Sequence, residues 1–165
     1  MDDMYLLDAN TYIQAKNIYY QLDFCPAYWH FLDQQFAAGI LRSIENVYDE
    51  LSPAGDELAG WVKERKEHFE PVVSNNIQQQ FKQVVQHIMD LPNKSPLSVN
   101  AFLNGADPWL IATAALTGAI IVTQEVPAPA DSRKVKIPNI CRDFNVEFMD
   151  TFSLLKELNA RFVLK

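Results

Sequence analysis

The sequence has few of the residues on which several common kinds of binding site depend. Its 165 residues include only five glycines, three histidines and two cysteines. No GxGxxG, P-loop or GxSxG motif occurs, which argues against a dinucleotide-binding protein, a P-loop nucleotidase and a serine hydrolase. The histidines, His30, His68 and His87, share no metal-ligand spacing. Cys25 and Cys141 lie far apart and outside any CxxC, which predicts two reduced, mostly buried thiols.

Long hydrophobic runs are also scarce, and positive charge is in the minority. The longest apolar run, 109–122, is interrupted at Thr117-Gly118 and is too short to span a bilayer. The N-terminus is acidic and soon turns polar, unlike a signal peptide, and we therefore expect a cytoplasmic protein without membrane contact. The net charge of −7 argues against general coating of nucleic acid. This charge remains compatible with an enzyme that binds RNA through a local group of cations, or with binding to a basic protein partner.

Short apolar runs alternate with amphipathic segments, which predicts an α/β fold with a parallel sheet covered on both faces. The expected strands are residues 4–8, 40–44, 119–123 and 146–150. The expected helices cover 10–20, 26–36, 45–51, a helix opened by Ser52-Pro53 with a charged tail, 77–88, one opened at Asp107, 138–144, and 151–158 capped by Thr151. Residues 93–105 and 126–135 are expected to be loops. The chain is predicted to form one domain over 1–165, with the helical segment of about 52–90 packed on the same core.

The stretch GADPWLIATAAL, residues 105–116, has two interpretations. Asp107 before Pro108 is typical of a helix N-cap, with proline at the first helical position. Asp107 could equally be a metal ligand, because a capping carboxylate can keep one oxygen free for a cation. Both roles are compatible with the sequence.

Four acids are predicted to gather at one edge of the sheet. Asp8 ends the first strand, Glu125 follows the strand 119–123, Asp107 opens the preceding helix, and Glu50 lies after the strand 40–44. The carboxyl ends of parallel strands are where ligands bind in such folds. Each acid alone could be an ordinary solvated side chain. Together they would repel one another, with about 4 kcal/mol for a pair 4 Å apart. The cluster therefore predicts a bound Mg²⁺ or Mn²⁺.

Aromatic and basic clusters offer weaker indications. The YWHF stretch, residues 28–31, could stack nucleic-acid bases, but its helical spacing favours a place in the core. The basic run 63–68 is interpreted as a solvated helix face. Arg133, Lys134 and Lys136 follow Glu125 in the same loop, and we expect them to contact substrate phosphates.

Several stretches together resemble the PIN-domain nuclease superfamily. YLLDANTYI resembles its opening strand, VYDEL the segment of its second acid, ADPWLIATAALTGAIIVTQE its central signature, and IPNICRDFNVEFMDTFSLLKEL its C-terminal elements. The resemblance extends to an uncharacterised PIN-like family related to VapC-type toxins. It implies a three-layer α/β/α sandwich with a short central parallel sheet, and a carboxylate-bound Mg²⁺ or Mn²⁺.

The resemblance also implies roles for individual residues. Asp8, Glu50, Asp107 and Glu125 match the catalytic, metal-binding acids, although Glu125 stands where many relatives have Asp. Asn10 and Thr123 match polar positions that support these acids. Glu45 or Asp49 could replace Glu50 as the second acid.

Two hypotheses of function follow. The first is a metal-dependent endoribonuclease that is the toxin of a type II toxin–antitoxin pair, with a cognate antitoxin and homodimers as implied partners. The second is a non-catalytic PIN-like module that binds RNA or protein. The complete set of four acids favours the first hypothesis, and the negative net charge mildly favours the second.

Overall fold

The computed structural model describes residues 3–164, so residues 1, 2 and 165 of the predicted 1–165 domain lie outside the described range. Its centre is a five-stranded sheet in the order β3-β2-β1-β4-β5, in which all neighbours are parallel. The strands are β1 (Tyr5–Leu7), β2 (Leu41–Ile44), β3 (Phe69–Glu70), β4 (Ile120–Val122) and β5 (Phe148–Met149). Parallel neighbours need crossover connections, which the helices supply.

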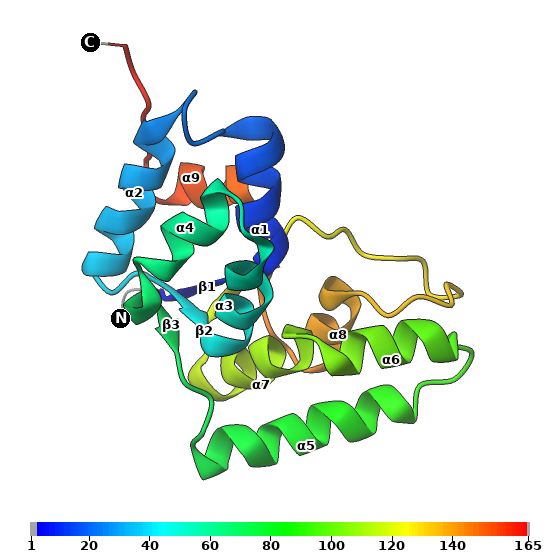
Figure 1. Ribbon diagram of the computed structural model, residues 1–165. Helices are drawn as coiled ribbons and strands as arrows, with labels where there is room; N and C mark the ends of the chain where they lie inside the picture. The colour runs from blue at the N-terminus through cyan, green and yellow to red at the C-terminus, as the bar shows by residue number, and fades with distance from the viewer. Residues whose placement is uncertain (1–2, 165) are drawn as a thin grey trace.

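Helices cover both faces of the sheet and make a three-layer α/β/α sandwich, which confirms the predicted fold class. In the view of Figure 1, α2 and α4 lie above the strands, and α5, α6 and α7 lie below them. The helices are α1 (Ala9–Gln14), α2 (Pro26–Ala37), α3 (Glu45–Leu51), α4 (Glu57–Lys63), α5 (Asn75–Met89), α6 (Pro96–Asn104), α7 (Asp107–Thr117), α8 (Ile137–Asp143) and α9 (Thr151–Glu157). A π-helical segment, Ala15–Tyr19, continues α1.

The buried apolar side chains of the described residues form one core. Leu6 and Leu7 of β1 are fully buried because helices cover both faces of the central strand. Val62 of α4 and Val84 and Ile88 of α5 belong to the same cluster, so the segment 52–90 contributes to this core. In α5 the apolar residues are spaced by three and four positions, and this places them on the face that packs against α7.

Three expectations about the elements are wrong. The predicted loop 93–105 contains α6, whose N-terminus is capped by the Ser95 hydroxyl. The helix expected from Ser52 is instead a single 3₁₀ turn that ends at Gly55, and α4 begins after its cap, Asp56. The chain beyond Lys63 is not a helical tail, because it turns and forms the short strand β3 beside β2.

Two predicted helix caps are also wrong. The N-cap of α7 is Ala106, whose backbone is already helical, so Asp107 is the first residue of the helix and Pro108 the second. The N-cap of α9 is Asp150, whose carboxylate accepts a hydrogen bond from the Ser153 amide at 2.8 Å, and Thr151 is the first helical residue. In both helices the chain becomes helical at a different residue from the one that the motif suggested.

Other sequence-based expectations agree with the structure. Cys25 and Cys141 are free thiols, and Cys141 is buried. Tyr28 and Trp29 of the YWHF stretch are buried in the core rather than free to stack on bases. Within residues 3–164, no helix is both long enough and apolar enough to cross a membrane.

Candidate active site

The centre of the candidate site is Asp8, at the carboxyl end of β1. Residues Leu7 and Val122 are partners in the parallel pairing of β1 and β4, so the residues that follow them lie side by side. The Asp8 amide donates to the Val122 carbonyl at 3.0 Å, and the Thr123 hydroxyl donates to Asp8 Oδ2 at 2.9 Å. Both Asp8 and Thr123 are buried. The sheet register therefore fixes the Asp8 carboxylate in one orientation.

Asn10 and Thr123 order the chain that leads to Glu125. The Asn10 side-chain oxygen accepts a hydrogen bond from the Gln124 amide at 3.1 Å. The Thr123 hydroxyl oxygen accepts another from the Glu125 amide at 3.2 Å. Glu125 Oε2 in turn accepts from the Ile137 amide, at the start of α8, at 2.9 Å. The Glu125 carboxylate is thus held by the Ile137 amide at the end of the β4–α8 loop, and the Glu125 backbone amide is held by the Thr123 hydroxyl.

Glu50 reaches the site from the last turn of α3. Its Oε1 accepts a hydrogen bond from the Ala106 amide, at the N-cap of α7, at 2.7 Å. Gly105 permits this approach, because a Cβ at that position would lie only 3.1 Å from the same oxygen. Of the alternatives for the second acid, Glu45 instead accepts from the Val72 amide at 3.2 Å. Asp49 and Glu50 are both exposed, but of the three acids only Glu50 is among the charges that raise the pKa of Asp8 and Asp107. The geometry favours Glu50 among the three.

Asp107 stands in the first turn of α7, where the helix dipole favours a negative charge. Within the described residues, its carboxylate makes no hydrogen bond to the protein. The pKa of Asp107 is raised to about 8, first by burial and then by the negative charges of Asp8, Glu125 and Glu50, in that order. The ammonium of Lys136 opposes this shift.

The same electrostatic environment acts on Asp8. The pKa of Asp8 is raised to about 7, first by burial and then by the negative charges of Glu125 and Glu50, although the Thr123 hydrogen bond opposes the shift. Glu50 and Glu125 therefore lie close enough to Asp8 and Asp107 to disfavour the charge of these two aspartates. The structure brings the four predicted acids together, although their catalytic and metal-binding roles stay predictions.

The donor set fits a divalent cation such as Mg²⁺ or Mn²⁺, because all four groups are hard carboxylate oxygens and their mutual repulsion would be relieved by positive charge. Within residues 3–164, however, no three acidic, histidine or cysteine side chains are already arranged around a common metal position. Glu50 and Glu125 each use one oxygen on a backbone amide and retain the other. A bound cation would stabilise Asp8 and Asp107 most, because burial disfavours their negative charge.

Cys141 of α8 is a neighbour of this site that the sequence analysis missed. Burial, Asp8, Glu125 and Asp107 raise the pKa of its thiol to about 12. The thiol is therefore neutral and buried, which argues against a role as a nucleophile. Only its place in an expected buried helix could have suggested that it lies near the acids.

The three predicted substrate-binding cations lie on the β4–α8 loop at different depths. Arg133 and Lys134 are exposed, and Lys136 is half-buried. Of the three, Lys136 is the one that acts on an acid of the site, Asp107. Their role as phosphate contacts stays a prediction.

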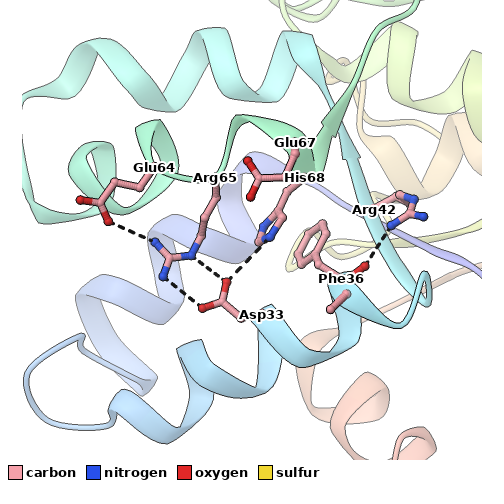
Figure 2. Close-up of a pocket in the computed structure, with 8 residues that line it drawn as sticks. Asp33, Phe36, Arg42, Glu64, Arg65, Glu67 and His68 are labelled. Carbon is pink, nitrogen blue, oxygen red and sulfur yellow. Dashed lines mark hydrogen bonds and ion pairs between the residues drawn. The ribbon is translucent and has the colours of Figure 1, made fainter.

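A separate cavity of about 470 Å³ lies near the amino end of β2. Figure 2 shows Asp33 between Arg65 and His68, with Arg65 also beside Glu64. Arg65 makes two hydrogen bonds to the carboxylate of Asp33, at 2.7 and 3.0 Å, and lies over the ring of Trp61. His68 stacks on Phe36 with 3.9 Å between ring centroids. These contacts connect α2 to the segment after α4, which indicates a structural role.

The fold has a counterpart among solved structures. A chain of the crystal structure of VapBC2 from Rickettsia felis, bound to a DNA fragment from their promoter, superposes with a TM-score of 0.53. It is 13% identical, and the match covers 89% of this chain and 98% of that chain. Together with the all-parallel sheet, this likeness defines the protein as one with a PIN-like fold of the VapC type.

The family can also be stated. A family model described as a domain of unknown function, DUF4411, matches residues 5–162, and the chain therefore belongs to this family. Among curated proteins, no significant match was found.

Proposed function

We propose that the protein is a metal-dependent endoribonuclease, acting as the toxin of a type II toxin–antitoxin pair. The observation that carries the proposal is the convergence of Asp8, Glu50, Asp107 and Glu125, two of which have pKa values raised to about 7 and about 8. Purely structural acids gain nothing from such an arrangement, whereas a carboxylate-bound cation turns it into a stabilising one.

Each residue of the acidic site has a proposed role. Asp8 and Asp107 would hold Mg²⁺ or Mn²⁺, with the remaining oxygens of Glu50 and Glu125 completing the set. When bound, the ion would lower the pKa of an attacking water and neutralise charge on the cleaved phosphodiester. Thr123 keeps Asp8 in position, and this hydrogen bond favours the ionised carboxylate that binds a cation.

The proposed partners follow from the fold and its relative. The VapBC2 structure contains a toxin–antitoxin pair, and we propose that this chain also has a cognate antitoxin. That antitoxin would be a small regulator encoded by a neighbouring gene. Self-association into a homodimer and a cytoplasmic site of action belong to the same proposal. Sedimentation of the purified chain, alone and with the neighbouring gene product, tests the two kinds of association.

The experiment for activity uses purified full-length protein and assorted single-stranded and structured RNAs. We expect cuts inside the RNA with Mn²⁺ or Mg²⁺, and none with EDTA. Asp8→Asn should remove the cuts, whereas Asp23→Asn, at an exposed position outside the acidic site, should leave them unchanged. Cuts that persist in EDTA or in Asp8→Asn would contradict the proposal.

A second candidate function is a PIN-like module that binds RNA or protein without cutting. Two observations favour it: the net charge of −7, and the hydrogen bonds that engage one oxygen each of Glu50 and Glu125. RNA binding without any cleavage across several divalent ions would support this candidate and reject the nuclease.

A further inference from the structure

A cavity of about 320 Å³ lies between the β4–α8 loop, α8 and the turn that joins α5 to α6. We call it the basic cavity, because four cationic side chains line it: Lys94, Lys134, Lys136 and Arg142. They are four of the 14 lysines and arginines in a chain with a net charge of −7. Such a concentration of one charge in an acidic protein indicates an anionic ligand.

These cations lack the acidic partners that other cations have. Lys16, Arg42 and Arg65 pair with carboxylates at 2.7–2.8 Å. Across residues 3–164, none of the four cations of the basic cavity has a carboxylate within 4.0 Å. The one acid that lines the cavity, Asp143, is bonded to His87 Nε2 at 2.8 Å. The cavity therefore keeps a net positive charge, with four cations against one carboxylate.

The cavity is also held in shape by hydrogen bonds across its rim. Lys94 Nζ donates to the Ser132 carbonyl at 2.7 Å, and the Ser95 amide donates to the Arg133 carbonyl at 2.9 Å. The Val135 amide donates to the Ser98 hydroxyl oxygen at 2.9 Å. In Figure 1 the long loop before α8 runs toward the turn between α5 and α6, which is where these bonds form. A site shaped before binding loses less conformational freedom when a ligand arrives.

Lys136 joins the basic cavity to the acidic site. It precedes α8, whose first amide, that of Ile137, holds Glu125. Its charge also reaches Asp107. Consider an RNA strand whose cleaved phosphate lies among the four acids. The first cation beyond the acids is Lys136, and the next ones are those of the basic cavity.

We propose that the basic cavity binds a backbone phosphate of single-stranded RNA next to the cleaved bond, with Lys94 and Arg142 as contacts from outside the β4–α8 loop. The inference rests on the proposed function, since it assigns a path for that substrate. Leu91, Val135 and Ile140 add apolar wall, which suits a sugar or base better than a free inorganic ion.

The test compares two double variants with the same change in charge. Lys94→Gln with Arg142→Gln alters the basic cavity, and Lys63→Gln with Lys156→Gln alters exposed lysines on α4 and α9, which do not line it. Binding of a labelled single-stranded RNA is measured by fluorescence anisotropy in EDTA, so that nothing is cut. Loss of contact with this one phosphate should reduce the slope of log affinity against log salt by about 0.7. Between about 50 and 200 mM salt, wild-type affinity should therefore fall about 2.6-fold more than that of the cavity variant.

The control pair should keep the wild-type slope, and Lys94→Arg with Arg142→Lys should keep it too if charge is what matters. Equal slopes for wild type and the Gln cavity variant would overturn the inference, as would an equal loss in the control pair. A fall in affinity for a polyglutamate peptide, with RNA affinity unchanged, would also overturn it. If the slope changes as expected but the wild type cuts no RNA with Mn²⁺, the binding site stands and the nuclease proposal fails.

Discussion

The metal-free protein should become more stable at alkaline pH when Asp107 is replaced by Asn. The pKa of Asp107 is raised from 3.8 to about 8. A group with a raised native pKa contributes full stability below its unfolded pKa, and this contribution is lost as the pH rises through the native pKa. The ionised form is therefore disfavoured at pH 9, where wild-type Asp107 has lost its proton.

The size of the effect follows from the same shift. At 1.36 kcal/mol for each pKa unit, ionising Asp107 in the native state costs about 6 kcal/mol. An amide is also penalised by burial, and so we expect Asp107→Asn to raise the free energy of unfolding by about 2–4 kcal/mol at pH 9. At pH 5 the wild-type carboxyl is protonated, and the gain should nearly vanish.

The assay is urea unfolding in EDTA at pH 5 and pH 9, with Asp23→Asn as the matched control at an exposed position. The gain should appear only for Asp107→Asn and only at pH 9. Because Asp107 is not a helix cap in the structure, Asp107→Ala should not show the loss of about 1 kcal/mol that removal of a cap produces. Equal stability of wild type and Asp107→Asn at both pH values would refute the electrostatic reasoning.

Three further predictions concern the cation, the substrate and the fold. Mn²⁺ at a hundred times its dissociation constant should add about 2.7 kcal/mol to the free energy of unfolding, and a melting temperature that is identical in EDTA and Mn²⁺ would count against a metal site. Changing Arg133, Lys134 and Lys136 together to Ala should weaken RNA binding and flatten its salt dependence, and an unchanged salt slope would move the RNA path elsewhere. Asp33→Asn should lower the free energy of unfolding by about 1–2 kcal/mol, because it weakens the partly exposed contact with Arg65, and should leave RNA cleavage unchanged. A loss of cleavage without a loss of stability would assign the cavity of Figure 2 a role in function.

Local sequence signals were sufficient for the central elements of the fold. The continuous apolar runs of β1 and β4 identify strands that are buried on both faces. The spacing of Val84 and Ile88 identifies the buried face of α5. Asp8 and Glu125 could be proposed as neighbours because each follows a predicted strand, and parallel strands end at the same edge of the sheet.

Other features depend on contacts that no local pattern contains. The two asparagines in α6 favour a loop prediction, although Ser95-Pro96 is a local helix-start signal, and packing on α7 completes the helix. Helix α7 begins at Asp107 rather than after it because Glu50, 56 positions away, holds the Ala106 amide. Lys94 could not be placed in the basic cavity from the sequence, since the contact that holds it there is its hydrogen bond to Ser132, 38 positions away.

Cleavage of a circular single-stranded RNA by the purified full-length chain tests the central claim most directly, because a circle has no end for an exonuclease to attack. The account predicts that Mn²⁺ converts the circle to a linear product, that EDTA prevents this, and that Asp8→Asn and Asp107→Asn each slow it by orders of magnitude while Asp23→Asn does not. Linear product formed at the wild-type rate by Asp8→Asn, or an intact circle with wild-type protein across a range of Mn²⁺ concentrations, would contradict it.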